Sequence, residues 1–171
     1  MKQFTKLLAI LCLSLSVFII ACKKDGQSTS TLNVRLTDAP AAYTAINIDI
    51  REVRVKLRDD SSSWTNLTTT ANVYNLLNFQ NGVDTLLATG IIPTGNVKEV
   101  RFILGPNNTV IDNGIVYPLQ LSSQDESGLK IKVSKSISSS FETMVIDFDA
   151  AQSVIKENNG TYRLKPVLKL K

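Results

Sequence analysis

Apolar and polar residues alternate along most of the chain, and this period of two restricts the fold more than any other feature. The clearest run covers residues 45–57, where isoleucine and then valine stand at every second position. Such alternation is typical of a strand with one buried face. The apolar phase slips by one residue between Ile50 and Val53, which would turn the second half inside out. We therefore predict a β-bulge at Arg51-Glu52, or a strand that changes sheets there.

Shorter alternating runs follow the same logic. The other predicted strands cover residues 31–37, 97–104, 129–133, 141–148 and 161–170, with weaker candidates at 63–68, 73–79, 85–88, 109–111 and 115–121. Turn sequences such as Asn81-Gly82 separate them, without long amphipathic helices between them. We predict an all-β fold, an antiparallel β-sandwich of the immunoglobulin-like or transthyretin-like kind. One short helix is expected near residues 150–156, with Asp149 as its N-cap.

Pro166 interrupts the last alternating run. Proline has no N–H to donate to a strand ladder, so we expect this segment to lie at the edge of a sheet. Basic residues occupy the opposite phase of the same run, and charges on an exposed edge hinder pairing with other chains. These residues are Arg163, Lys165, Lys169 and Lys171.

The first 21 residues have the pattern of a targeting segment. Lys2 and Lys6 supply positive charge, and residues 7–21 form an uncharged apolar stretch that ends in a small residue. A membrane-spanning helix requires about 20 apolar residues, which this stretch does not reach. We therefore predict a signal peptide over residues 1–21.

The sequence Ile19-Ile20-Ala21-Cys22 resembles a bacterial lipobox, in which signal peptidase II cuts before the cysteine. The resemblance implies a diacylglycerol on the Cys22 thiol and an acyl chain on the new amine, a lipid anchor with several chains (palmitate-type). Cleavage after Ala21 with an unmodified Cys22 is the alternative. Lys23-Lys24-Asp25 resembles the tag of surface-exported lipoproteins of Bacteroidota. The expected location is the outer membrane of a Gram-negative cell envelope, facing the periplasm or the surface.

Processing at Cys22 would also change the composition. Loss of Lys2 and Lys6 lowers the net charge from +4 to +2, a surplus too small to indicate nucleic acid binding. Cys12 leaves with the leader and Cys22 carries lipid, so no disulfide is expected. Residues 22–30 are expected to form a flexible tether, and residues 31–171 one β domain.

Short blocks occur in a particular order after residue 31. They include Asp38-Ala39-Pro40, Asn75-Leu76-Leu77, Pro93-Thr94-Gly95, Ser127-Gly128-Leu129-Lys130, Ile146-Asp147-Phe148-Asp149-Ala150 and Leu164-Lys165-Pro166-Val167. Their order resembles a family of bacterial lipoproteins, domain of unknown function 4382, over nearly all of residues 31–171. The resemblance implies a secreted, usually lipid-anchored β-sandwich with no established activity and no catalytic residues.

Three carboxylates are the candidate metal ligands. Asp147 and Asp149 share the non-core phase of one strand, about 7 Å apart, and Asp38 follows the first strand. Oxygen ligands of this kind suit Ca²⁺. However, the spacing of an EF-hand is absent, Asp149 also fits a helix cap, and Asp38 before Ala39-Pro40 also fits a turn.

Basic residues stand on the outward phase of three predicted strands. If those strands were neighbours, the side chains would form a stripe that attracts an acidic glycan or an anionic membrane. Asp49, Glu99 and Asp147 stand at comparable phases and would interrupt it by cross-strand pairing. Trp64 and Tyr74 are candidates for stacking on sugar rings, although the core also needs aromatic residues. The basic residues are Arg54, Lys56, Arg58, Lys130, Lys132, Arg163 and Lys165.

These features favour a non-enzymatic, lipid-anchored envelope domain that binds a glycan or another envelope protein. The alternative is a structural subunit of a fimbria-like surface assembly, built through an exposed strand edge. An enzyme ranks third, because the absence of histidine removes Ser-His-Asp and Cys-His catalysis and no carboxylate pair stands apart as in glycosidases. No cofactor is expected apart from the candidate calcium ion.

Overall fold

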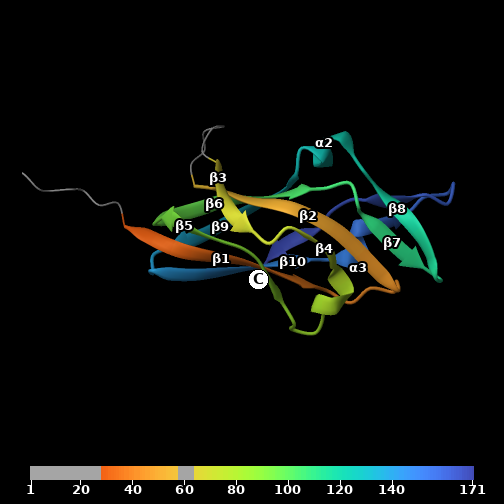
Figure 1. The fold of residues 1–171 in the computed structure, drawn as a ribbon, viewed down its shortest axis with the longest axis horizontal. Coiled ribbons are helices and arrows are strands. Elements are labelled where there is room, and N and C mark those ends of the chain that lie inside the picture. The colour runs from red at the N-terminus through yellow and green to blue at the C-terminus, as the bar shows by residue number, and fades with distance from the viewer. Residues whose placement is uncertain (1–27, 58–63) are drawn as a thin grey trace, which may run out of the picture.

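A computed structural model describes residues 28–57 and 64–171, and within them thirteen strands join into one curled sheet (Figure 1). The predicted leader, the lipidation candidate Cys22 and the basic residue Arg58 lie outside the described residues. The strands are β1 (Thr29–Asp38), β2 (Ala45–Lys56), β3 (Trp64–Thr69), β4 (Asn72–Asn75), β5 (Thr85–Pro93), β6 (Gly95–Leu104), β7 (Thr109–Asp112), β8 (Ile115–Leu121), β9 (Leu129–Ile137), β10 (Phe141–Phe148), β11 (Val154–Lys156), β12 (Tyr162–Leu164) and β13 (Leu168–Leu170).

The sheet has two arms. In the first arm β1 lies between β5 and β10, and β13 follows β10 at the end of the pairing order. In the second arm β2 pairs with β6, and β6 pairs with β9. Strand β3 pairs with both β2 and β5 and so connects the two arms. The inner faces of the arms enclose one hydrophobic core.

The core is built from the inward positions of the alternating strands, which confirms the period-of-two prediction. Burying one leucine or isoleucine side chain stabilises a fold by about 1.5–3 kcal/mol. Fully buried examples from four strands are Leu32, Val34, Leu36, Ile46, Ile48, Ile50, Val53, Val55, Val100, Phe102, Met144, Ile146 and Phe148. Both arms therefore depend on the same interior for their stability.

The predicted β-bulge lies in β2. The pairing with β6 changes register between Ile50 and Glu52, so that Arg51 is the extra residue. Ile50 and Val53 are both fully buried, although three positions separate them. The bulge thus corrects the phase and keeps both halves of β2 directed at the core.

The mostly β class is confirmed, but two separate antiparallel sheets are not. The sheet is mixed, because β1 pairs parallel to β10 and β8 pairs parallel to β12. It is also continuous, because β3 belongs to both arms. The result is a curled half-barrel, and the sandwich prediction is not confirmed at that level of detail.

The helical segments are short. Helix α3 covers Ala150–Ser153, and Asp149 caps it as predicted by accepting a hydrogen bond from the Gln152 N–H. The helix was expected to reach residue 156, but β11 begins at Val154 and pairs with β12. β-branched Val154 and Ile155 favour this strand conformation. Helix α2 (Ser123–Glu126) and the 3₁₀ turn η2 (Leu76–Phe79) had not been predicted.

The predicted strand over residues 161–170 is divided at Pro166. Its first half, β12, pairs with β8 and β11, whereas its second half, β13, pairs with β10. Ser153 holds the crossing segment, since its carbonyl accepts from the Lys165 N–H and its hydroxyl accepts from the Val167 N–H. β13 ends the pairing order, so the edge prediction is confirmed for that half.

The first strand begins at Thr29, so two residues of the predicted tether already belong to the sheet. The start of β1, the turn from β5 to β6 and the turn from β9 to β10 lie at one end of the molecule, and the β7–β8 hairpin lies at the other (Figure 1). Among the described residues, no helix is long and apolar enough to cross a membrane.

Candidate binding surface

The outer face of β2, β6 and β9 carries rows of basic side chains. Residues directly opposite one another in neighbouring strands project to the same face. Arg54 of β2 lies opposite Arg101 of β6, and Arg101 lies opposite Lys130 of β9. The residues on either side in β6, Val100 and Phe102, are fully buried, so the row points away from the core.

The neighbouring row mixes charge with an aromatic ring. Trp64 of β3 lies opposite Lys56 of β2, Lys56 lies opposite Glu99 of β6, and Glu99 lies opposite Lys132 of β9. The basic strands β2 and β9 are not direct neighbours, because β6 lies between them, but all three belong to the same arm of the sheet. We call this surface the basic face and define it by Arg54, Lys56, Trp64, Arg101, Lys130 and Lys132.

The Trp64 ring contacts two cations. The guanidinium carbon of Arg101 lies 4.1 Å from the ring centroid, and the Lys56 Nζ lies 5.8 Å from it. Cation–π contacts of this kind contribute about 0.5–1 kcal/mol at exposed sites. The Trp64 side chain is half-buried, so the ring is fixed in place and still reaches the surface.

Acidic side chains neutralise only part of the basic face. Glu52 pairs with Arg54 at 2.6 Å, and Glu99 pairs with Lys56 at 3.4 Å. Interruption by Glu99 is therefore confirmed. Within residues 28–57 and 64–171, we find no ion-pair partner for the cations of the central and outer strands, Arg101, Lys130 and Lys132.

Shallow depressions flank these unpaired cations. One of about 370 Å³ is lined by Glu99, Lys132 and their neighbours, where the pairing of β6 with β9 shifts register. A second of about 390 Å³ is lined by Gly128, Lys130 and residues of the preceding turn. Both are wide open and suit a long ligand that lies along the surface better than a small molecule that needs enclosure.

Two predicted members of the stripe lie elsewhere. Arg163 is on β12, which pairs with β8 and β11, and it forms an ion pair with Glu157 at 2.8 Å. Lys165 follows β12 in the crossing segment and donates its backbone N–H to Ser153. The basic face is therefore confined to β2, β3, β6 and β9.

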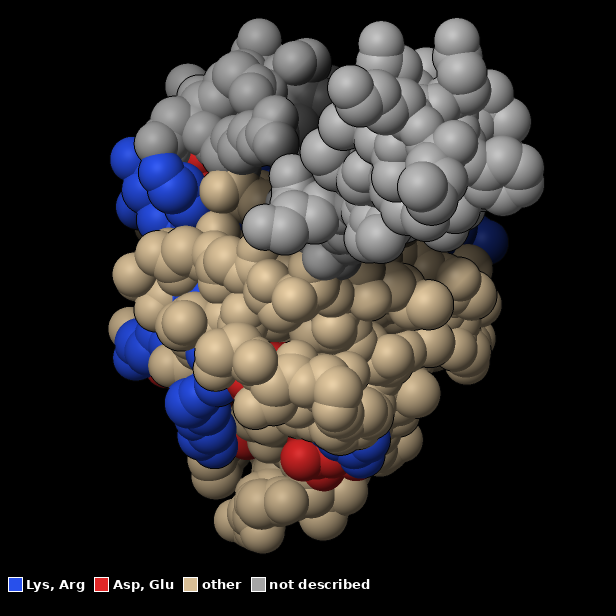
Figure 2. Space-filling view, turned by 90° about the vertical axis from the view of Figure 1, so that its left-hand side faces the viewer, with Lys and Arg blue, Asp and Glu red and all other residues tan. Residues whose placement is uncertain are grey.

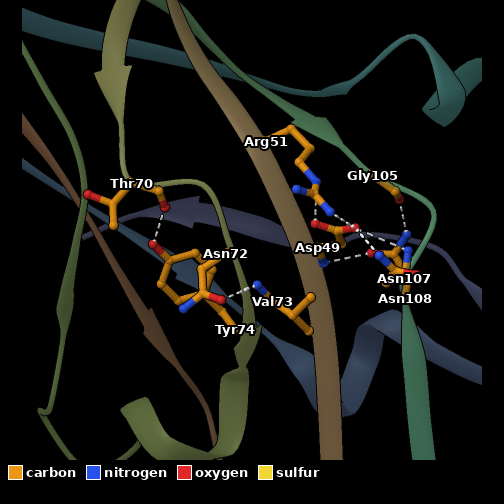
Figure 3. Close-up of polar contacts among 9 residues, drawn as sticks. All are labelled: Asp49, Arg51, Thr70, Asn72, Val73, Tyr74, Gly105, Asn107 and Asn108. Carbon is orange, nitrogen blue, oxygen red and sulfur yellow. Dashed lines mark hydrogen bonds and ion pairs between the residues drawn. The ribbon is translucent and has the colours of Figure 1, made fainter.

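Tyr74, which the sequence suggests as a ligand-binding residue, lies in the core. It is only 7% exposed, its ring lies 6.2 Å from that of Phe79, and its hydroxyl donates to the Thr70 carbonyl (Figure 3). Burial raises the pKa of the Tyr74 hydroxyl. A ring enclosed in this way cannot stack on a sugar.

The three candidate calcium ligands are each engaged by the protein. Asp38 accepts from the Ala150 N–H at 2.9 Å and from the Gln80 side chain at 3.3 Å. Asp149 accepts from both the backbone and the side chain of Gln152. Asp147 lies near Lys171, at 3.8 Å. No cluster of three or more potential metal ligands occurs in the part of the chain that the structure describes.

The fold changes the titration of the Asp38 carboxyl. Burial raises its pKa, and hydrogen bonds from Ala150 and Gln80 oppose this effect without reversing it. Nearby Asp147 adds a smaller repulsion in the same direction as burial. Asp38 therefore links the end of β1 to Ala150, directly after β10. Burial at this position disfavours the charged form of its carboxyl.

A second polar cluster surrounds Asp49, a residue that the sequence analysis treated only as an outward charge. Asp49 is fully buried, and its carboxylate accepts from the Arg51 guanidinium and from the backbone and side chain of Asn107 (Figure 3). Its N–H donates to the Asn108 side chain, and its carbonyl accepts from the Gly105 N–H. This network attaches the loop between β6 and β7 to β2.

Gly105 is required by this network. A Cβ at residue 105 would collide with the Asp49 carboxylate and would lie 2.6 Å from the Arg51 Nε. The sequence signal for this cluster is the Gly105-Pro106-Asn107-Asn108 turn, but its partner in the sequence-distant strand β2 cannot be recognised from spacing.

A third cluster joins β7 to β11 and β12. The Tyr162 hydroxyl and the Lys156 ammonium both donate to Asp112, and Lys156 also lies over the Tyr162 ring. The hydrogen bond from Tyr162 lowers the pKa of Asp112, and the same contact raises that of Tyr162. Every member already has a partner within the fold, so the cluster serves the structure.

The Asp49 network should contribute more to stability than the surface ion pair of Glu52 and Arg54 in the same strand. We expect Asp49→Ala to lower the free energy of unfolding by about 2–4 kcal/mol, because the bulge and the loop lose the hydrogen bonds that Arg51 and Asn107 donate to a fully buried carboxylate. Glu52→Ala is the matched control, since Glu52 and Arg54 form a surface pair in the same strand, and it should cost about 1 kcal/mol or less. Urea unfolding measures both, and equal losses would contradict the assignment.

The raised pKa of Asp38 makes a specific contribution to pH dependence. In the folded protein Asp38 holds its proton to higher pH than in the unfolded chain, so its contribution to stability falls as pH rises above the ordinary value of 3.8. Below that value the contribution is constant. Asp38→Asn should flatten this fall, as measured by urea unfolding over a pH series. A parallel pH profile for both proteins would show that Asp38 titrates normally.

Comparison with known proteins identifies one relationship. No curated protein and no solved structure matches the chain. The family model described as Domain of unknown function (DUF4382) matches residues 29–166, from the start of β1 to the proline that separates β12 from β13. This match covers most of the chain and includes both arms of the sheet, and the protein therefore belongs to the DUF4382 family.

Proposed function

We propose that this protein is a lipid-anchored, non-enzymatic binding domain of the bacterial cell envelope, and that its ligand is an acidic glycan that binds to the basic face. The observation that supports this proposal is the alignment of Arg101, Lys130 and Lys132, three cations without an ion-pair partner among the described residues, beside the half-buried ring of Trp64. The proposal includes no nucleic acid and no cofactor.

The chemistry of the face suits a polymer with repeated negative groups. Arginine can bind a carboxylate or sulfate group with two parallel hydrogen bonds, and lysine binds it as a point charge. An indole presents a flat apolar surface on which the apolar side of a sugar ring can pack. The basic face offers both the ionic contact and the ring stacking from neighbouring strands.

The anchor in this proposal is Cys22, six residues before Ser28, where the described chain begins. The apolar stretch and the lipobox-like residues before Cys22 are its support. A lipoprotein so anchored would lie at the outer membrane of a Gram-negative bacterium, with the folded domain close to the lipid surface. In fold terms, we propose that the two arms correspond to the layers of the expected β-sandwich, joined through β3.

A structural role in a surface assembly is the second candidate. Strand β9 pairs with β6 along one edge, and no described strand pairs with its other edge. An unpaired edge of this length can accept a strand from another chain. However, β9 carries Lys130, Lys132 and Lys135, and lysines on an edge oppose such pairing. We therefore favour ligand binding.

Calcium is not part of the favoured proposal. The Asp38 and Asp149 carboxylates already accept hydrogen bonds from backbone and glutamine donors, and a metal ion would compete with those donors. A calcium-dependent domain would require these bonds to be exchanged for metal coordination.

Binding is tested with the detergent-solubilised mature protein on immobilised polygalacturonate and heparin, with neutral dextran as the uncharged reference. We expect retention on the two acidic polymers, weakened by salt. The Lys130→Ala, Lys132→Ala double variant should bind about tenfold more weakly, a loss of about 1.4 kcal/mol. Trp64→Ala should also weaken binding without any change in net charge.

The matched control is Arg163→Ala, Lys165→Ala, which removes the same charge outside the basic face. It should bind the acidic polymers nearly as well as the wild type. Equal losses in the two double variants would mean that only net charge matters, and no retention of the wild type on either polymer would refute the proposal.

The anchor is tested separately with Cys22→Ser. We expect the wild type to fractionate with membranes and to carry the mass of its lipid, and the variant to appear in the soluble fraction because the thiol that accepts diacylglycerol is gone. Alkaline washing of membranes followed by mass spectrometry measures both properties. Continued membrane association of the variant after washing would exclude lipid as the anchor.

A further inference from the structure

We propose that the uncharged end of the domain, which presents Ile91 and Phe141, docks on the surface of the phospholipid bilayer to which the chain is tethered. This inference rests on the proposed lipid anchor, and it goes further by assigning a face of the folded domain to the membrane. Ile91 is 72% exposed and Phe141 is 57% exposed, so both present apolar surface to the surroundings.

The two side chains belong to one row of the sheet. Thr31 of β1 lies opposite Ile91 of β5 on one side and opposite Phe141 of β10 on the other. The next residue of β1, Leu32, is fully buried, so the row containing Thr31 points outward. Two strand spacings separate Ile91 from Phe141, which is about 10 Å. They form a pair of apolar side chains on the same outer surface.

Among the described residues, the segments around this pair lack charge. No aspartate, glutamate, lysine or arginine occurs in residues 28–34, 85–97 or 136–141. Figure 2 shows this end, and the middle of its described surface is mostly free of charged side chains. Glu142, which follows Phe141 in the sequence, pairs with Lys135 at 3.3 Å. An uncharged end avoids the cost of bringing ionic groups against lipid.

The position of the tether brings this end to the membrane. Strand β1 starts at Thr29, two residues before Thr31, the β1 member of the row. Nine residues separate Cys22 from Thr31, and a fully extended chain of that length spans at most about 32 Å. The β1 member of the row that carries Ile91 and Phe141 therefore remains within that distance of Cys22. A second apolar contact would supplement the acyl chains.

The β7–β8 hairpin serves as a control for this inference, because it also exposes apolar side chains. Ile115 and Val116 of β8 are 56% and 60% exposed, as much as Phe141. They lie on the β7–β8 hairpin, at the end of the molecule opposite the start of β1 (Figure 1). Exposed apolar side chains at that end are not brought to the membrane by the tether.

The test uses the full-length lipidated protein in vesicles of phosphatidylethanolamine and phosphatidylglycerol. Phe141→Cys and Ile115→Cys each introduce one thiol for a nitroxide label, because the only native cysteines are Cys12 and Cys22. We expect the label at residue 141 to collide more with membrane-dissolved oxygen than with an aqueous nickel chelate, and the label at residue 115 to show the opposite. Equal aqueous exposure of both labels would overturn the inference.

A second set of variants keeps one label position and replaces the apolar side chains that are proposed to touch the bilayer. With the nitroxide at Ser139→Cys, in the turn before Phe141, the additional changes Ile91→Gln and Phe141→Gln should abolish the preference for oxygen. The matched changes Ile115→Gln and Val116→Gln should leave it intact. Loss of the preference in both backgrounds, or in neither, would contradict docking through this end.

Mass spectrometry of the same preparations separates this inference from the proposed anchor. Absence of lipid on Cys22 would overturn both. Lipid on Cys22 together with aqueous labels at residues 139 and 141 would overturn the docking alone. A label at residue 141 that becomes protected from both reagents only at high protein density would show that the row binds a second copy of the chain, which also overturns it.

Discussion

Strand β2 is the constraint on which the rest of the structure depends, because it has neighbours along both edges. Strands β3 and β4 follow one another on one edge, and β6 and β7 follow one another on the other. Its inward residues must all meet one core while the sheet curls around them. The bulge at Arg51 makes this geometry consistent, because it restores the inward phase at Val53 and increases the local twist.

The loop between β6 and β7 separates two strands that pair with the same edge of β2. Asp49 holds this loop against β2. A buried carboxylate is costly unless charge and hydrogen bonds compensate it. Arg51 supplies the charge from the bulge itself, and Asn107 supplies donors from the loop. The bulge and the loop therefore stabilise one another, and the close approach of Gly105 leaves no space for a side chain.

Local features of the fold could be predicted from the sequence, whereas long-range pairing could not. The period of two and its slip at Arg51 are visible in neighbouring residues, and so is the Asp149 cap. Alternation assigns each residue to a face but does not choose the neighbouring strand, so the parallel pairing of β1 with β10 was missed. The burial of Tyr74 could not be predicted for the same reason, because it depends on contacts with Phe79 and Thr70 outside its own strand.

The two arms use the same alternation but place different residues on their outer faces. β1, β5 and β10 present threonine, asparagine and apolar residues near the end where β1 begins, whereas β2, β6 and β9 present lysine and arginine. A tethered domain free to tumble would lay its basic face on anionic lipid headgroups, which would compete with an acidic ligand. Docking through the uncharged end would instead hold the strands away from the bilayer and keep the cations beside Trp64 accessible.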